Sequence, residues 1–185
     1  MKLKKFNFKI VNSTNSIAID MIKNSNNKSG FISANKQKKG RGRYNKKWIS
    51  YKGNLFVTIF FTLDKIDLSI KQLTKINCFL IKKLLSFYYK KKISIKRPND
   101  LLIGKKKISG ILQERINIEN KKFLIVGIGI NLIKSPKIKN YPTTNLYELT
   151  NKKFKKEKIE QKLKLIYENF IPKLQKLNTN TLIKI

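Results

Sequence analysis

The sequence predicts an α+β domain in which a mixed, largely antiparallel β-sheet is backed by helices. The chain has 185 residues, 41% of them hydrophobic, so it is long enough to bury a substantial core. Two apolar runs, at residues 55–63 and 123–132, have the length of buried strands. Two longer patterns have helical spacing, and the order of strands, helix, strands, helix is typical of this fold class.

Strands and one short helix are expected in the first third of the chain. Apolar and polar residues alternate over residues 6–10, which predicts a strand. The Ser-Thr-Asn segment at 13–15 offers side-chain caps for a short helix with apolar residues over 17–22. A short strand is expected at 30–34, and a basic, glycine-punctuated loop without apolar periodicity at 36–47.

A second group of elements follows the loop. Residues 54–63 predict a strongly apolar strand, and apolar residues at helical spacing predict a long helix from about Leu68 to Lys90. A short strand at 93–96 should end at Pro98, because proline disfavours continuation of the element before it.

The last third predicts a hairpin over residues 101–113 with its turn at Gly104, then a buried strand over 123–132. Apolar spacing over 159–170 marks a terminal amphipathic helix, which we expect to be interrupted near Pro172.

The formal net charge of +33 admits two explanations. Such a charge is typical of proteins that bind nucleic acid, so a non-enzymatic, basic nucleic-acid-binding domain is the alternative function. The lysines, however, spread along the whole chain together with many asparagines and isoleucines, as a codon bias toward AT-rich sequence would produce. We therefore expect no specific DNA binding, although the charge should steer the protein toward acidic partners.

Other features of the sequence bear on where the protein works. No apolar run is long enough to cross a bilayer, and no apolar stretch follows the charges at the N-terminus, so neither a membrane association nor a signal peptide is expected. The single cysteine, Cys78, lies in an apolar helical pattern and is interpreted as a buried core residue. A cytoplasmic location is expected from these observations.

The chemically distinctive residues gather in the centre of the chain. All four arginines lie between Arg41 and Arg115, all eight glycines between Gly30 and Gly129, and the single tryptophan is Trp48. The sequence contains no histidine, which excludes a Ser-His-Asp hydrolase and a histidine-ligated zinc site. Acyl adenylation suits this inventory, because its nucleophile is a carboxylate that is already anionic and catalysis is charge neutralisation and positioning.

Four segments of this central region are candidates for binding. Alternating glycine and arginine at 40–43 suit a loop that closes over an anion. Residues 96–100, Lys-Arg-Pro-Asn-Asp, place an amide and a carboxylate after a strand, although this segment taken alone favours an ordinary turn. Residues 107–112 combine a lysine with a strand that contains Gly110. Residues 127–131, Gly-Ile-Gly-Ile-Asn, lie in an apolar strand with no helix close behind, so a Rossmann site is not expected.

In this order, the segments resemble the catalytic domain of biotin–protein ligases, over about three-quarters of the chain from Ser13. The family has a Ser-Thr-Asn near the start, a G-R-G-R-x-G loop, a K-W-P-N-D turn, a K-[LI]-x-G-[IL]-L strand and a G-x-G-x-N strand. The resemblance implies the class II aminoacyl-tRNA synthetase-like fold of biotin and lipoate ligases. Lipoate ligases share fold and adenylation step, but their R-R-x-[ST]-G-G-G loop is not present here.

The resemblance implies roles for individual residues. Biotin binding is implied for three groups: Ser13, Thr14 and Asn15; Gln37 with the loop Gly40, Arg41, Gly42 and Arg43; and Lys107 with Gly110. ATP binding is implied for Arg43, Trp48, Lys96, Asn99, Asp100, Lys107 and Asn131. The expected catalytic residues are Lys107, Arg43 and Asp100, and Asp100 is the candidate ligand for Mg²⁺.

The implied activity is ATP-dependent conversion of biotin to biotinyl-5′-AMP, followed by transfer to one lysine of a carrier protein. The expected partner is the biotin carboxyl carrier protein or domain of acetyl-CoA carboxylase, and a homodimer is possible in this family. A member of the family that keeps the fold but has lost activity is a further alternative.

Two residues depart from the family pattern. Asn45 stands where the loop has its last glycine, and asparagine tolerates a positive φ better than most residues do. Arg97 replaces the tryptophan of K-W-P-N-D, which changes the local packing. Because neither a helix-turn-helix nor a C-terminal β-barrel domain is recognised, residues 1–185 are expected to be a single catalytic domain without repressor function.

Overall fold

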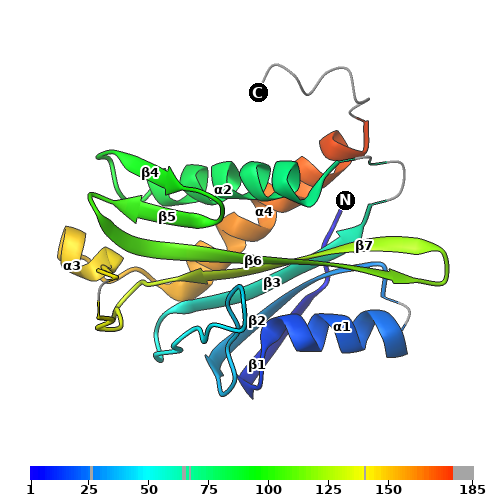
Figure 1. Ribbon diagram of the computed structural model, residues 1–185, viewed down its shortest axis with the longest axis horizontal. Coiled ribbons are helices and arrows are strands. Elements are labelled where there is room, and N and C mark those ends of the chain that lie inside the picture. Colours follow the sequence, from blue (N-terminus) through cyan, green and yellow to red (C-terminus); the bar gives the residue numbers. More distant parts are fainter. Residues whose placement is uncertain (26, 64–65, 67, 140, 177–185) are drawn as a thin grey trace.

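The computed structural model describes residues 1–25, 27–63, 66, 68–139 and 141–176 and contains one seven-stranded sheet (Figure 1). The strands are β1 (Lys5–Val11), β2 (Ser29–Gln37), β3 (Leu55–Thr62), β4 (Ile93–Lys96), β5 (Asp100–Ile103), β6 (Lys106–Ile118) and β7 (Lys121–Ile130). Their order across the sheet is β1-β2-β3-β7-β6-β5-β4. Only β1 and β2 pair in parallel, which confirms the mixed, largely antiparallel sheet.

Within the described residues, four helices connect and cover the strands. They are α1 (Thr14–Asn24), α2 (Ile70–Ser86), α3 (Leu146–Thr150) and α4 (Lys156–Lys176). In Figure 1, α2 and α4 lie on one face of the sheet and α1 lies on the other. The parallel pairing of β1 with β2 requires a crossover, and α1 is that crossover. It therefore starts where β1 ends, against the middle of the sheet.

Most predicted elements are confirmed, with differences at their ends. The helix expected from Leu68 to Lys90 is α2, and it begins with a capping box between Ser69 and Gln72. Ser13 is the N-cap residue of α1, but its side chain makes no capping bond. The turn at Gly104 is confirmed by its φ of 60°.

The expected interruption of the last helix at Pro172 is wrong, because α4 continues through it to Lys176. A proline inside a helix costs about 3 kcal/mol through its missing hydrogen bond and the clash of its ring. The apolar stripe of α4, which includes Tyr167, Ile171 and Leu174, is fully buried on both sides of the proline. Burial of these large side chains offsets the cost. Helix α3 was not expected, since five residues are too few to show helical periodicity.

The large core lies between the sheet and helices α2 and α4. Every second residue of β3 and β7 enters it: Leu55, Val57, Ile59, Phe61, Leu124, Val126, Ile128 and Ile130. A smaller core lies under α1, where Ala18 and Ile22 pack against Ile32, Phe60 and Ile125. The sheet therefore has one face that is covered throughout by apolar side chains and one that is covered in part.

A buried carboxylate joins α4 to the edge of the sheet. Glu160 is 3% exposed, and its Oε2 lies 2.6 Å from Lys5 Nζ of β1. Its Oε1 accepts a hydrogen bond from Ser33 of β2 and lies 3.4 Å from Lys156 Nζ. Because a buried carboxylate without partners is very costly, this cluster requires β1, β2 and α4 to be assembled together.

Candidate functional site

The site occupies the part of the sheet that α1 leaves uncovered. On this face β7 presents Phe123 and Ile125 under α1, and then Gly127 and Gly129. A Cβ atom at Gly127 would lie 2.3 Å from Asn15 Oδ1, and one at Gly129 would lie 2.4 Å from the indole of Trp48. The two glycines are therefore required, because these side chains rest directly on the strand.

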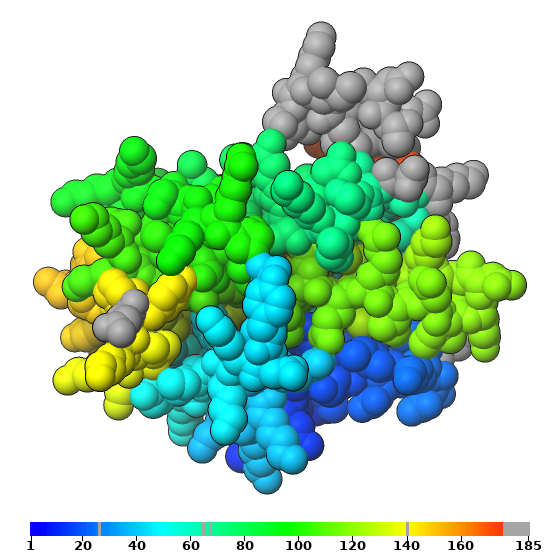
Figure 2. Space-filling view, in the orientation of Figure 1, coloured from blue at the N-terminus to red at the C-terminus, as the bar shows by residue number. Residues whose placement is uncertain are grey.

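Above the glycines lies a cavity of about 770 Å³, lined by the start of α1, the loop after β2, β6, β7 and the β4–β5 turn. Figure 2 shows the loop in cyan, standing in front of the sheet between the green region of β4 and β5 and the blue region of α1. This volume is sufficient for a ligand with several chemical groups.

A β-bulge brings Lys107 into the cavity. In the pairing of β5 with β6, Leu102 lies opposite Lys107 and Leu101 opposite Ser109, so one residue of β6, Ile108, is extra. The bulge shifts the alternation of side chains by one position. Lys107 then faces the same side as Gly110, where a Cβ would lie 3.1 Å from Lys107 Nζ.

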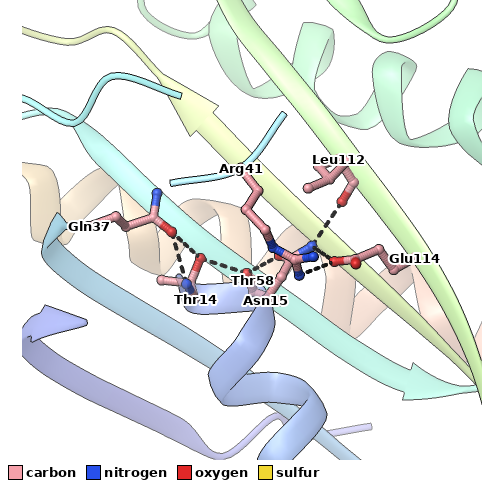
Figure 3. Close-up of polar contacts among 7 residues, drawn as sticks. All are labelled: Thr14, Asn15, Gln37, Arg41, Thr58, Leu112 and Glu114. Atoms are coloured by element: carbon pink, nitrogen blue, oxygen red, sulfur yellow. Dashed lines mark hydrogen bonds and ion pairs between the residues drawn. The ribbon is translucent and has the colours of Figure 1, made fainter. Parts of the chain in front are cut away.

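One end of the cavity is a chain of neutral hydrogen bonds (Figure 3). Gln37 Oε1 accepts from the backbone N–H of Thr14 at 2.8 Å and from its hydroxyl at 3.1 Å. Thr58 Oγ1, from β3, lies 2.8 Å from Thr14 Oγ1 and 2.6 Å from Asn15 Oδ1. Since Gln37 uses its oxygen inside the protein, its amide NH₂ can donate to a ligand. Thr58 was missed in the sequence because it lies inside an apolar strand.

The chain of hydrogen bonds ends at the charged pair of Glu114 and Arg41, and Glu114 was not identified from the sequence. Asn15 Nδ2 donates to Glu114 Oε2 at 2.6 Å, and Arg41 Nη2 donates to the same oxygen at 2.8 Å (Figure 3). Glu114 lies on β6, two residues after Leu112, so the alternation of this strand was the only signal for it.

The glycine–arginine loop is a narrow hairpin. Trp48 N–H donates to Gly40 O at 2.9 Å and Gly42 N–H to Lys46 O at 2.6 Å. At its tip Tyr44 and Asn45 have φ values of 51° and 57°. The expectation that asparagine replaces the usual glycine at a positive φ is therefore confirmed at Asn45. Arg43 stacks on the Tyr44 ring, with its guanidinium carbon 4.7 Å from the ring centroid.

The other end of the cavity carries cations and aromatic rings. Lys107 Nζ lies 2.7 Å from Asp100 Oδ1, 5.3 Å from the Trp48 ring centroid and 5.3 Å from that of Tyr141. Lys96 Nζ lies 4.7 Å from the Tyr141 centroid. The Tyr141 hydroxyl donates to Asp100 Oδ2. Burial, and next the hydrogen bond to Asp100 and its negative charge, raise the pKa of Tyr141 well above its usual value, so this phenol stays protonated.

Comparison with known protein families identifies the family of this chain. The model of the "Biotin/lipoate A/B protein ligase family" matches residues 7–131, more than half of the chain. The chain belongs to this family. The matched range contains the start of α1, the loop, β6 and β7 up to Asn131, and so nearly all of the cavity.

Individual members of the biotin/lipoate ligase family are similar to the chain. It is 28% identical over 167 residues to the bifunctional ligase/repressor BirA of Bacillus subtilis, which covers 86% of this chain and 51% of that protein. The chain thus spans about half the length of this relative. The biotin protein ligase of Aquifex aeolicus, solved with biotin and ATP, superposes with a TM-score of 0.79 at 27% identity, covering 94% of this chain and 72% of that one.

A third similar protein has a lower sequence identity, so its similarity is evidence for the fold only. The biotin protein ligase of Leishmania major, solved with biotinyl-5-AMP, gives a TM-score of 0.77 at 20% identity, covering 98% of this chain and 78% of that one. These superpositions confirm the class II synthetase-like fold expected from the sequence.

Most residues that the family resemblance singled out meet in the cavity. Its lining includes Ser13, Thr14, Asn15, Gln37, Arg41, Gly42, Arg43, Trp48, Lys96, Asn99, Asp100, Lys107 and Gly110. Gly40 lies instead on the other side of the loop. Asn131 is 2% exposed and outside the lining, and its amide donates to Thr144 O at 3.1 Å. Its contact with the triphosphate stays a prediction.

Other expectations concern a metal, a thiol and a membrane. Over the described ranges, no cluster of three or more His, Cys, Asp or Glu side chains is arranged to hold a metal ion. Cys78 is buried as expected, and burial, together with the charge of Asp100, raises the pKa of its thiol to about 12. Within the part of the chain that the structure describes, no helix is long and apolar enough to span a bilayer.

Proposed function

We propose that this chain activates biotin with ATP to form biotinyl-5′-AMP and transfers the biotinyl group to a lysine of a carrier protein. One observation carries the proposal: a single cavity has a neutral hydrogen-bonding end and a cationic, aromatic end, and Lys107 belongs to the cationic end. An adenylation site needs one end for the acyl group and one end for the nucleotide, since the bond to be made joins the acyl group to a phosphate. The Aquifex relative, solved with biotin and ATP, supports the choice of substrates.

The neutral end suits the ureido ring of biotin. A cyclic urea offers one carbonyl oxygen and two N–H groups. Gln37 has an unused amide NH₂ that can donate, the hydroxyl of Ser13 can donate or accept, and that of Thr14, whose proton goes to Gln37, can accept. All three side chains line the cavity at the point where α1 begins.

The cationic end suits the nucleotide. Lys96 and Lys107 lie there, Arg43 of the loop lines the same cavity, and the rings of Trp48 and Tyr141 offer apolar faces for a base. The indole Nε1 of Trp48 is buried and has no hydrogen-bond partner within the described structure, so a ligand acceptor would satisfy it.

In the first step, a carboxylate oxygen of biotin attacks the α-phosphorus of ATP. The bond from that phosphorus to the bridging oxygen breaks, and pyrophosphate leaves with the electron pair. Lys107 and Arg43 neutralise the negative charge that accumulates on the phosphate as the two anions approach each other. To do so, Lys107 must exchange its contact with Asp100 for the substrate.

Asp100 is the candidate residue for holding Mg²⁺. Magnesium in nucleotide sites is typically held by one or two carboxylates together with the phosphates, so a single aspartate fits that pattern. Both oxygens of Asp100 are engaged, Oδ1 with Lys107 and Oδ2 with Tyr141, and Oδ1 would become available when Lys107 turns to the phosphate.

In the second step, the amine of the acceptor lysine attacks the acyl carbon of the mixed anhydride. The bond to the phosphate oxygen breaks, AMP leaves, and the nitrogen loses a proton to give the amide. The proposed acceptor is the biotin carboxyl carrier domain of acetyl-CoA carboxylase. An acidic surface on the acceptor would be attracted by the strongly cationic chain.

Biotin-dependent exchange of labelled pyrophosphate into ATP tests the first step directly. We expect exchange with biotin and none with lipoate. Exchange with lipoate alone would assign the chain to the lipoate branch of its family. Exchange with neither would contradict the proposal, and salt-titrated RNA binding would then test the basic nucleic-acid-binding alternative.

A further inference from the structure

Glu114 is an acidic side chain in a strongly cationic neighbourhood. The chain has only 10 acidic residues against 43 basic ones, and the cavity on the outer side of the loop is lined by Lys38, Lys39, Lys46 and Lys47 among others. Glu114 is the one carboxylate in that lining among the residues described. Its side chain is 25% exposed, so it is partly shielded from water.

Both partners of Glu114 belong to the site. Its Oε2 accepts from Asn15 Nδ2, which lies against Gly127, and from Arg41 Nη2 in the loop (Figure 3). One carboxylate oxygen thus joins the loop, the start of α1 and β6. Hydrogen bonds between charged partners are roughly twice as strong as neutral ones, so this is the firmest junction at the loop.

The tip of the loop, residues 41–46, has no comparable attachment, whereas Trp48 at the end of the loop rests on Gly129 of β7. Within residues 41–46 the hydrogen bonds are internal: Gly42 to Lys46, Lys46 to Arg43, and Arg43 to Tyr44. In the described structure, the pair of Arg41 with Glu114 is the only hydrogen bond or ion pair between residues 41–46 and the rest of the chain.

We propose that Glu114 is a positioning residue that holds the loop of residues 40–48 over the site through Arg41. The inference rests on the proposed function for its consequence, which is retention of the adenylate. Arg41 then acts by anchoring the loop, because its guanidinium is engaged by Glu114, and Arg43, which has no acidic partner in the described structure, is the arginine that meets the ligand.

Hydrogen exchange on the ligand-free protein tests the anchor without any assumption about activity. Glu114→Gln removes the charge but leaves an oxygen that accepts from Asn15, so the fold at α1 is kept. We expect the backbone amides of Gly42 and Trp48 to exchange about two- to fivefold faster, the range for loss of one partly exposed ion pair. In wild type, about 1 M NaCl should shift exchange in the same direction.

Two further variants separate the anchor from a general loss of stability. Glu119→Gln removes an exposed acid at the β6–β7 turn and should leave exchange in the loop unchanged. In the double variant Arg41→Gln/Glu114→Gln, the loop amides should exchange hydrogen no faster than in either single variant, since both substitutions remove the same interaction. Unchanged exchange in Glu114→Gln, or additive effects in the double variant, would overturn the proposal.

The consequence for the reaction is measured in the presence of biotin and ATP. In Glu114→Gln, biotin-dependent pyrophosphate exchange should continue, while release of biotinyl-5′-AMP into solution rises about two- to fivefold. Faster hydrogen exchange in the loop with unchanged release of biotinyl-5′-AMP would show that Glu114 does not help to retain the adenylate. If the wild type shows no pyrophosphate exchange, the proposed function fails, and the hydrogen-exchange result still decides whether Glu114 anchors the loop.

Discussion

The two faces of the sheet are made by the same strands and have opposite contents. Toward α2 and α4, the central strands β3 and β7 present Val57, Val126 and Ile128, all buried. Toward the cavity, the neighbouring positions hold Thr58 and Gly127 instead. One face thus carries large aliphatic side chains, and the other carries glycine or polar residues at the neighbouring positions.

This difference teaches how a rigid site is made from strands. Side chains on the aliphatic face fix the backbone, because tightly packed cores resist displacement. The opposite face can then carry glycines and hydrogen-bonding groups without becoming mobile, since its backbone is held from behind. Changes on the site face should therefore affect activity before stability, and changes on the aliphatic face should do the reverse.

Lys107→Met should produce the largest effect and only on the site face. It keeps much of the side-chain length and removes the charge that the proposed adenylation step needs, so biotin-dependent pyrophosphate exchange should fall about 1000-fold. Lys105→Met, at the exposed hairpin turn, is the matched control and should keep wild-type exchange. Exchange by Lys107→Met within about twofold of wild type would show that this role is wrongly assigned.

Leu84→Ala should affect the aliphatic face alone. Leu84 of α2 is fully buried in the large core, so its truncation should lower the free energy of unfolding by about 3 kcal/mol in urea titration. Well below its melting temperature, the variant should keep the wild-type kcat for exchange. A large loss of kcat in the folded variant would mean that the two faces are not separable.

Gly129→Ala is expected to change nucleotide binding without a comparable change in stability. Its added methyl would lie 2.4 Å from the Trp48 indole, which must move, so KM for ATP should rise about tenfold. Ile130→Val, one residue later and in the large core, should leave KM unchanged and lower stability by about 1 kcal/mol. Equal KM values in the two variants would contradict the contrast.

The smallest effect concerns Cys78, which lies at the large core. Its pKa is raised from 9.0 to about 12, so its contribution to stability is complete below pH 9 and is lost as pH rises toward 12. Between about pH 8 and pH 10, wild type should lose about 1 kcal/mol more unfolding free energy than Cys78→Ala. Identical pH dependence in the two proteins would show that the buried thiol does not titrate as inferred.

Most elements of the fold were predictable from the sequence because their signals are local. Alternation in β1, apolar runs in β3 and β7, and the helical spacing of α2 are each visible within about ten residues. The continuity of α4 through Pro172 was not visible, since it depends on burial against distant residues.

The site was predictable only in part, for the same reason. Motif residues such as Gln37 and Lys107 stand in recognisable segments, and they do meet in the cavity. Thr58 and Glu114 stand in no motif, and their role depends on which face of a strand they occupy and on neighbours from other strands. The bulge at Ile108, which turns Lys107 inward, likewise becomes visible only once β5 and β6 are paired.

The buried carboxylate of Glu160 has a consequence for synthesis of the protein on the ribosome. Every residue that lines the cavity has been made by Tyr141, before the first residue of α4 is added. Until then, α4 is not present to pack on the aliphatic face of β3. Lys5 also lacks its partner Glu160, which lies 155 positions further along the chain. The nascent chain therefore carries every residue that lines the cavity before α4 is made, and the cluster around Glu160 can form only after this helix has been translated.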